Sequence, residues 1–308
     1  GGGGGSNPSN TARRNRVQPP RLASAEHPAY SARQAHRGPE ETQLRTTIGV
    51  EGIDTLIEGE IPRGSATLVS GEAGTGKSVL CIQFILAGIR EGESGVFATA
   101  DHPGRVIEAA SSLGWDLRGA VDDGYARVVR IERNPAPVAE AAPPTDEAQP
   151  ADEDQPADAG EAAEAPQAPS APAKPSTPTE AAEAAAATIA AAVAEIGAER
   201  VAIDPPMLAG SPDADSASEY IAALLRATLR DTHCTTLFSG LRVRGAPGLT
   251  RLGIEEQIAD GIIDLRVEEE AGRRHRVLAV REMHGTRTNL DDHLFAILAG
   301  RGIVVGEA

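Results

Sequence analysis

Short apolar runs alternate with longer amphipathic segments along most of the chain after residue 45. The apolar runs have strand length and are bounded by Gly, Pro or Asp, and the segments between them have helical periodicity. We expect strands over residues 65–71, 95–100, 126–131, 200–204 and 234–240, and helices over 77–91, 103–113, about 180–196 and 216–229. This alternation predicts an α/β fold with a mainly parallel sheet flanked by helices.

After Gly253 the pattern changes to that of antiparallel strands. Residues 261–270 and 275–283 flank Ala271-Gly272, so they are predicted to form a β-hairpin. Its far end carries opposite charges that can pair across the two strands, namely Glu268 to Glu270 with Arg273, Arg274 and Arg276. The C-terminal part of the sheet is therefore expected to be antiparallel.

Two segments show no periodicity. Residues 1–44 are rich in Gly, Arg, Ser and Pro, and residues 134–180 are rich in Pro, Ala and acidic side chains. Such compositions bury too little apolar surface to offset the entropy lost on ordering the chain, so both segments are expected to be disordered. We therefore expect one domain over residues 45–308, interrupted by the 134–180 insertion.

Charge is unevenly distributed along the chain. The formal net charge is −16, and 3% of the residues are aromatic. Residues 1–39 contain six arginines and a single acid, Glu26, whereas the predicted insertion contains ten acidic residues and one base, Lys174. An acidic body with few aromatic side chains suits neither phosphate backbones nor stacked bases, so nucleic-acid binding is not expected.

The cysteines and the apolar runs indicate where in the cell the protein is expected. Cys81 and Cys234 lie far apart and fit no metal-ligand spacing, which favours small buried residues in a reducing environment. No apolar run approaches the roughly 20 residues that span a bilayer. The N-terminus lacks the apolar core of a signal peptide. A soluble cytoplasmic protein without a membrane segment is expected.

Residues 71–78 have the spacing of a phosphate-binding loop between a predicted strand and a predicted helix. They read Gly71-Glu72-Ala73-Gly74-Thr75-Gly76-Lys77-Ser78. The glycines let backbone amides turn toward a β-phosphate, and the helix N-terminus favours its negative charge. Lys77 is expected to reach the β- and γ-phosphates, and the Ser78 hydroxyl to coordinate Mg²⁺. The loop predicts a site for a nucleoside triphosphate.

Lysine usage and a strand-end aspartate support this site. The chain has two lysines, Lys77 and Lys174, and the second lies in the predicted insertion. A chain that otherwise uses arginine keeps the slim ammonium where a planar guanidinium would not fit. Asp204 ends a predicted buried strand, which Pro205-Pro206 stops at once. We expect Asp204 to bind Mg²⁺ in the outer sphere.

The order of these motifs resembles the RecA superfamily, and within it the KaiC-like branch of ATPases. The matching text is "TTIGVEGIDTLIEGEIPRGSATLVSGEAGTGKSVLCIQFILAGI", "GVFATADHPGRVIEAASSLGWDL", "TTLFSGLRV", "GIEEQIADGIIDLR" and "HGTRT", over about residues 46–133 and 181–308. The resemblance implies a RecA-like core with ATP and Mg²⁺ as ligands. It also implies self-association into rings or filaments that hold nucleotide between subunits, and it makes Ser239 the polar residue that ends the next strand.

The chain departs from this family where water is activated. KaiC-like proteins end the second strand with a Glu-Glu pair, whereas this chain has Asp101-His102, which are its candidate catalytic residues. Aspartate is one methylene shorter than glutamate, and a misplacement of about an ångström can slow a reaction on the order of a hundredfold. Hydrolysis is therefore expected to be slow.

The residues expected to serve a neighbouring subunit differ as well. Where the family has Lys and Arg, this chain has Glu282 and His284, which share one face of a strand, while Arg281 points to the other face. Arg287, beyond the next turn, is the better-placed cation. The segment "GIEEQ" also lacks the Ser-Thr pair of the self-phosphorylating KaiC domain, which argues against an autokinase.

Two classes of function remain open at this point. The first is an ATP-bound regulatory or signalling oligomer of KaiC-like type with slow turnover. The second is a RecA-type recombination or repair ATPase that coats single-stranded DNA. The acidic body and the scarcity of aromatic residues disfavour the second, and the arginine-rich tail is its support.

Overall fold

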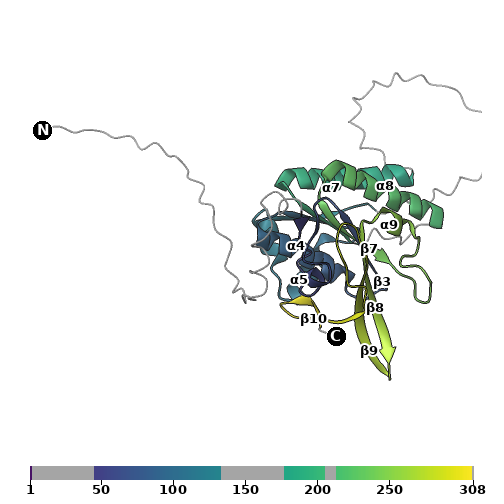
Figure 1. Ribbon diagram of the computed structural model, residues 1–308. Coiled ribbons are helices and arrows are strands. Elements are labelled where there is room, and N and C mark those ends of the chain that lie inside the picture. Colours follow the sequence, from purple (N-terminus) through teal and green to yellow (C-terminus); the bar gives the residue numbers. More distant parts are fainter. Residues whose placement is uncertain (2–44, 133–176, 205–212, 307–308) are drawn as a thin grey trace, which may run out of the picture. The chain divides into compact units, whose positions relative to one another are not determined.

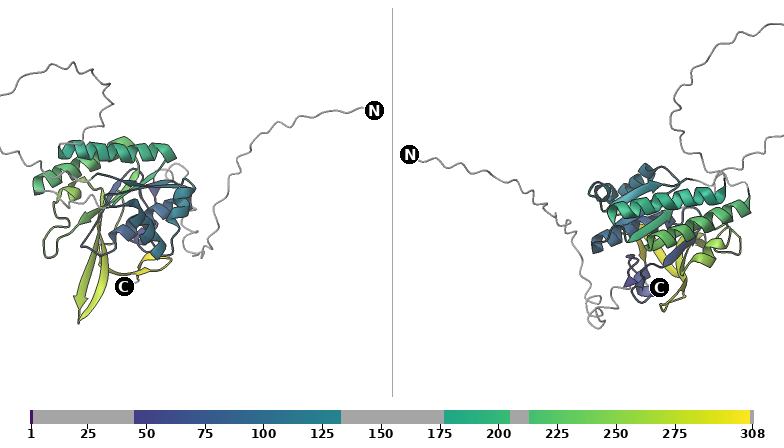
Figure 2. Two further views of the ribbon diagram at one scale, coloured as in Figure 1. Left: turned by 180° about the vertical axis from the view of Figure 1, so that it is seen from behind. Right: turned by 90° about the horizontal axis from the view of Figure 1, so that it is seen from above.

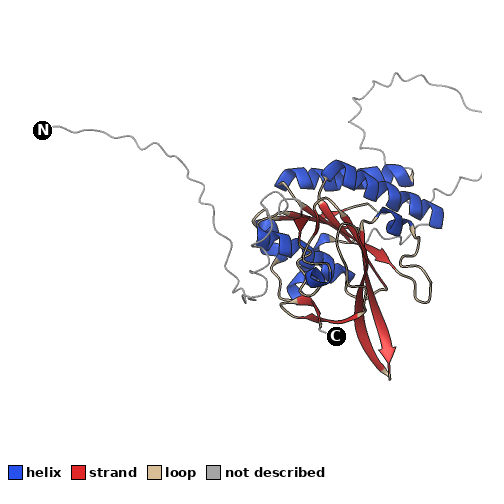
Figure 3. Cartoon of the chain, in the orientation of Figure 1, coloured by secondary structure: helices blue, strands red, loops and turns tan. Residues whose placement is uncertain are grey.

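A mixed sheet holds the parallel and antiparallel strands together. The computed structural model describes residues 1, 45–132, 177–204 and 213–306, and within them this sheet has nine strands in the order β11-β10-β9-β8-β3-β7-β6-β4-β5 (Figure 1, Figure 3). The described elements belong to one compact unit, residues 43–308. The predicted fold class, α/β with a mainly parallel sheet and antiparallel strands at its C-terminal part, is confirmed.

The strands divide into a parallel and an antiparallel set. The parallel set is β3 (Ala66–Gly71), β4 (Gly95–Thr99), β5 (Ala126–Arg130), β6 (Arg200–Asp204) and β7 (Thr235–Leu241), with β8 (Gly261–Glu270) parallel to β3. The antiparallel set continues from β8 through β9 (Arg273–Met283), β10 (His293–Leu298) and β11 (Gly302–Val305). Two short strands, β1 (Arg45–Thr46) and β2 (Ile61–Pro62), pair separately.

Helices cover both faces of the sheet. The helices are α3 (Ile53–Leu56), α4 (Lys77–Glu91), α5 (Pro103–Ser112), α6 (Leu117–Asp122), α7 (Pro178–Ile196), α8 (Ala214–Thr232) and α9 (Ile254–Ile258). Figure 2 shows the green helices α7 and α8 on the opposite side of the sheet from the blue helices α4 and α5. None of the helices among the described residues has both the length and the apolar character needed to cross a bilayer.

Alternation along the central strand β3 gives each face its own core. Val69 packs with α4, and its neighbour Leu68 packs with α7 and α8 on the other face. Both side chains are fully buried. Strand β3 thus passes through the centre of the molecule, and its carboxyl end leads directly into the predicted phosphate loop.

The two long helices begin earlier than the apolar pattern predicted, because capping residues extend them. Thr177 caps α7 by accepting a hydrogen bond from Glu180 N, and Asp213 caps α8 by accepting one from Ser216 N. The predicted end of the insertion at residue 180 is therefore wrong, since α7 starts at Pro178. Residues 2–44 and 133–176, which make up the predicted tail and the rest of the insertion, lie outside the described residues, as do 205–212 and 307–308.

The predicted hairpin is confirmed, and its register sorts the charged residues near its end. Glu270 lies opposite Arg273 and Glu269 lies opposite Arg274, as expected. Arg276 instead lies opposite Val267. Val267 and Arg276 both line a pocket beside the predicted phosphate loop.

A buried arginine fixes the carboxyl end of α4. The Arg200 guanidinium is fully buried and donates to Glu91, to Glu93 and to the hydroxyl of Thr46. It also lies over the Phe84 ring, 4.8 Å from the centroid. Through these bonds Arg200 links Thr46 to the end of α4. Removing one partner from such a buried pair would leave an uncompensated charge.

Candidate active site

The loop between β3 and α4 has the backbone of a phosphate cradle. Gly74 and Gly76 have φ values of 79° and 117°, which side-chain-bearing residues rarely adopt. A Cβ at Gly71 would lie 2.6 Å from the carbonyl oxygen of Leu265, so the first loop position is closely packed. The Thr75 hydroxyl, which is fully buried, donates to Glu72 O at 2.9 Å and closes the loop on itself.

The ammonium of Lys77 lies inside this loop. Its Nζ donates to the carbonyl oxygens of Gly71 and Glu72, each at 2.8 Å. Burial lowers the pKa of Lys77, and the negative charges of Asp204 and Glu72 act against that shift. The lysine is therefore held at the centre of the loop, where it faces the position expected for phosphate oxygens.

The ends of β6 and β7 bring Asp204 and Ser239 to the same place. Ser239 Oγ donates to Asp204 Oδ1 at 2.7 Å, and Ser78 at the start of α4 also hydrogen-bonds to that carboxylate. Asp204 is 5% exposed. Burial raises the pKa of Asp204, while the hydrogen bonds from Ser78 and Ser239 and the charge of Lys77 oppose the increase. The structure thus joins these predicted residues in one hydrogen-bonded network, in which Asp204 and Ser239 are buried and Ser78 is exposed.

This network has the donors and acceptors that a nucleotide with Mg²⁺ requires. Mg²⁺ at phosphate loops is held by few protein ligands together with phosphate oxygens and water. Ser78 would supply the direct protein ligand, and Asp204, already hydrogen-bonded to Ser78, would act from the outer sphere. The amides of the loop and Lys77 would hold the phosphates. The residues therefore fit ATP and Mg²⁺.

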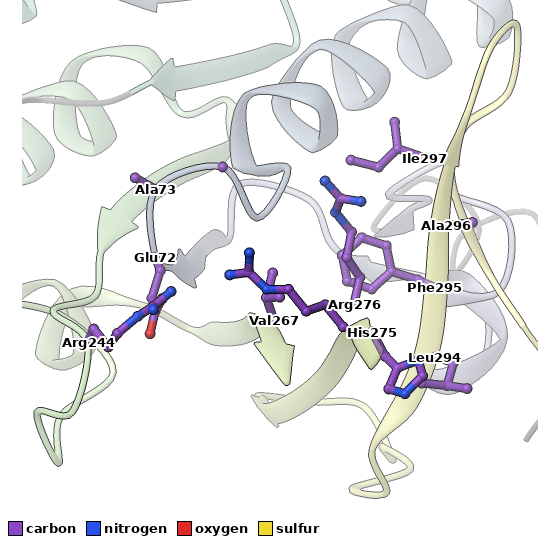
Figure 4. Close-up of a pocket in the computed structure, with 12 residues that line it drawn as sticks. Glu72, Ala73, Arg244, Val267, His275, Arg276, Leu294, Phe295, Ala296 and Ile297 are labelled. Carbon is purple, nitrogen blue, oxygen red and sulfur yellow. The ribbon is translucent and has the colours of Figure 1, made fainter. Parts of the chain in front are cut away.

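A pocket of about 660 Å³ opens beside the loop and was not predicted from the sequence. Glu72, Ala73 and Gly74 line it, with Arg244 beside Glu72. In Figure 4, Phe295 and Ile297 of β10 form a second wall, away from Arg244. These residues come from segments far apart in the chain, so only the order of the strands brings them to the phosphate loop.

The two candidate catalytic residues differ in their surroundings. Asp101, at the end of β4, is partly buried, and its charge contributes to the raised pKa of Asp204. His102 caps α5, and its Nδ1 accepts a hydrogen bond from Gly104 N at 3.1 Å. Asp101 is therefore within electrostatic range of the network, whereas His102 has a structural role at a helix end.

The exposed face at the end of β9 carries Glu282 and His284 in contact with each other. Glu282 Oε1 lies 2.7 Å from His284 Nε2, and both side chains are more than half exposed. Arg281 is directed to the other face, where it pairs with the buried Asp264. Arg287 is exposed. The predicted placement of these side chains on opposite faces of the strand agrees with these contacts.

Comparison with known proteins places this architecture among its relatives. A family model described as "ATPase: KaiC" matches residues 46–308. The UPF0273 protein MK0039 of Methanopyrus kandleri is 31% identical over 256 residues, which cover 82% of this chain and 88% of that protein. The circadian clock oscillator protein KaiC of Synechococcus elongatus is 29% identical over 83% of this chain, and the match spans 42% of that longer protein.

A solved structure is similar as well. The crystal structure of the KaiC-like protein PH0186 from Pyrococcus horikoshii OT3 matches with a TM-score of 0.64 and 26% identity, covering 85% of this chain and 99% of that one. The described sheet and its helices thus match nearly the whole length of that solved chain. The chain therefore belongs to the KaiC family of ATPases, within the RecA superfamily of P-loop proteins.

Proposed function

We propose that this protein binds ATP with Mg²⁺, hydrolyses it slowly, and acts as a regulatory oligomer whose assembly depends on the bound nucleotide. The observation that carries the proposal is the hydrogen-bonded network of Ser78, Asp204 and Ser239 beside the Lys77 ammonium. ATP would supply a phosphoanhydride bond that releases free energy when water cleaves it. Every residue needed to hold that group is present and partnered.

The pocket beside the loop supports an orientation for the nucleotide. A Cβ at Gly76, near the end of the loop, would lie 2.9 Å from Ile297 Cδ1, so β10 adjoins the side of the loop from which α4 begins. Loop and helix-start amides hold the α- and β-phosphates in proteins of this type. The base and ribose would therefore lie against Phe295 and Ile297 of β10, and the γ-phosphate near Ala73.

Slow hydrolysis follows from the groups that would activate water and balance charge. Asp101 has a shorter reach than the glutamate of the family pattern, and His102 is engaged in capping α5. Glu282 would repel a γ-phosphate on a neighbouring subunit. His284 is hydrogen-bonded to Glu282. Cations that reach a γ-phosphate from a neighbour can accelerate related reactions by about 10³ to 10⁵. The presence of Glu282 and His284 in place of such cations supports a low rate of ATP hydrolysis.

A second copy of the chain is the partner that we propose for the edge of this site. Leu290, Leu294 and Leu298 are 63%, 55% and 40% exposed. The last two lie on the exposed face of β10, and Leu294 lines the pocket. Exposed apolar side chains of this kind at a ligand site are typical of interfaces. The relative named circadian clock oscillator protein KaiC supports a regulatory role.

The test is to measure affinity and turnover on one purified sample. Titration calorimetry with ATP should show clear binding in Mg²⁺ and weaker binding after chelation of the metal. Phosphate release should be at least about a hundredfold below the 1 to 10³ s⁻¹ common for enzymes. Sedimentation with and without ATP reports assembly. No binding of ATP, or turnover above about 1 s⁻¹, would overturn the proposal.

A further inference from the structure

An ion pair at the rim of the phosphate loop is not used by any step of the proposed function. Glu72, the second residue of the loop, pairs with Arg244, which follows β7. We propose that Arg244 is a specificity-determining residue that contacts the γ-phosphate of ATP, and that Glu72 competes with this phosphate for the guanidinium. The inference rests on the proposed binding of ATP and assigns a residue that selects ATP over ADP.

Strand pairing explains why Arg244 lies beside the loop. Strands β3 and β7 are parallel neighbours, and Gly71 is in register with Leu241. The ladder continues one step further, because Arg242 N donates to Gly71 O at 3.0 Å. The chain after β7 therefore leaves the sheet next to the start of the phosphate loop. Figure 4 shows Arg244 against Glu72 at the edge of the pocket that Ala73 and Gly74 also line.

The ion pair leaves Arg244 with donors for a second acceptor. Its Nε and Nη2 both donate to the same oxygen, Glu72 Oε2, at 3.1 and 3.0 Å. A guanidinium has five N–H donors, so further donors remain for an anion in the pocket. The Arg244 side chain is 74% exposed, and exposed ion pairs contribute little to stability. An incoming phosphate can therefore share or replace Glu72 without disturbing the fold.

The charge balance of the site gives Arg244 a function. Lys77 is the cation at the centre of the loop, and the carboxylates of Glu72 and Asp204 both act on its pKa. Asp101 acts in turn on Asp204. A triphosphate brings further negative charge close to these three carboxylates, and the γ-phosphate would lie at the loop's early residues, nearest Glu72. Arg274 and Arg276 line the same pocket from β9, whereas Arg244 is the arginine paired with Glu72 itself. A second cation there, the Arg244 guanidinium, offsets a repulsion that ADP, which ends at the β-phosphate, does not meet.

Two substitutions with opposite expected effects test the assignment. Binding of ADP and of the β,γ-imido analogue of ATP, which is not hydrolysed, is measured by calorimetry in Mg²⁺ for each full-length variant. Arg244→Gln should weaken the triphosphate about tenfold and change ADP less than about twofold. Glu72→Gln removes the competitor and its repulsion, so it should strengthen the triphosphate about threefold with ADP unchanged. Arg251→Gln, at an exposed arginine of the same loop outside the pocket, is the matched control.

The outcomes separate this inference from the function on which it rests. Normal binding of both nucleotides with an unchanged preference in Arg244→Gln and Glu72→Gln would overturn the inference alone. Equal losses for ADP and the triphosphate, or the same effect from Arg251→Gln, would also overturn it, because these results indicate a general charge effect. A wild-type protein that binds neither nucleotide would overturn the proposed function and this inference together.

Discussion

The two halves of the candidate active site differ in how completely they are built. In the half that would hold phosphates and metal, the side chains are hydrogen-bonded to one another or to the loop, and Asp204 and Ser239 are buried. The other half would activate water and balance the negative charge of the γ-phosphate. There, His102 caps a helix and Glu282 pairs with His284 at the surface. Under the proposed function, binding and turnover would therefore depend on different side chains of this fold.

The contrast has a physical origin. A buried carboxylate such as Asp204 is costly unless hydrogen bonds stabilise its charged form, so the binding half tolerates little change. Exposed side chains such as Glu282 and His284 carry no such burial cost, so replacing them is expected to disturb the fold little. A member of this family could thus hydrolyse ATP more slowly while it keeps its affinity for ATP.

The largest expected effect is loss of ATP binding in Lys77→Ala. The ammonium should form charge-assisted bonds to phosphate oxygens, each contributing about 1.5 to 3 kcal/mol, so two bonds correspond to at least about a hundredfold in affinity. The fold should remain, since Lys77 bonds only to loop carbonyls among the described residues. Calorimetry with ATP measures the loss. Lys174→Ala, at the other lysine of the chain, is the control, and equal affinities in the two variants would contradict the role of the loop.

The next effect is a gain of turnover in Asp101→Glu. The added methylene extends the carboxylate toward the γ-phosphate, and correcting a misplacement of that size can raise the rate by up to about a hundredfold. Phosphate release at saturating ATP is the measurement. His102→Asn serves as the comparison, because asparagine also caps helices and should leave the rate within about twofold. A slower Asp101→Glu together with an inactive His102→Asn would make His102 the catalytic base.

A smaller gain is expected from Glu282→Lys combined with His284→Arg. These changes restore cations on the face of β9 predicted to serve a neighbouring subunit, and turnover should rise by about tenfold or more. The gain should appear in the assembled form and vanish on dilution to monomers. Glu270→Lys, at the far end of the hairpin, changes charge in the same direction and is the control. A gain that persists in monomers would rule out action between subunits.

Local signals account for what the sequence could predict. The phosphate loop is contiguous, and Asp204 is marked by a buried run ending at two prolines, so both were identified from the residues themselves. Ser239 was identified by resemblance. Helix starts were missed by two residues because the caps Thr177 and Asp213 lie outside the apolar pattern.

Long-range contacts could not be predicted in this way. The Glu72–Arg244 pair joins residues 172 positions apart, and it exists because β7 lies next to β3. The apolar wall at Phe295 likewise depends on β10 reaching the pocket through β9 and β8. The sequence "SGLRVR" places two arginines after a buried strand. That these arginines lie beside the phosphate loop could be inferred only once β7 was known to pair with β3.

The smallest expected effect lies within the binding half, in Ser239→Ala. Removing this donor to Asp204 raises the pKa of the carboxyl further above its usual range, because burial is then opposed by fewer hydrogen bonds. The charged form is the one that holds Mg²⁺, so ATP affinity should fall as pH decreases through that pKa. Ser239→Ala should lose affinity at a higher pH than wild type, with a loss of about threefold near neutrality.

Calorimetry with ATP and Mg²⁺ over a range of pH values on both sides of neutrality measures this shift. Ser218→Ala, at a hydroxyl that donates to Ala214 O on the exposed face of α8, is the matched control. Asp204→Asn cannot titrate at this position, so its affinity should be low and independent of pH across the range. If Ser239→Ala and wild type followed the same pH profile, Ser239 would have no influence on the charge of Asp204. The polar end of β7 would then belong to the packing of the sheet, and the binding half would consist of Lys77, Ser78 and Asp204.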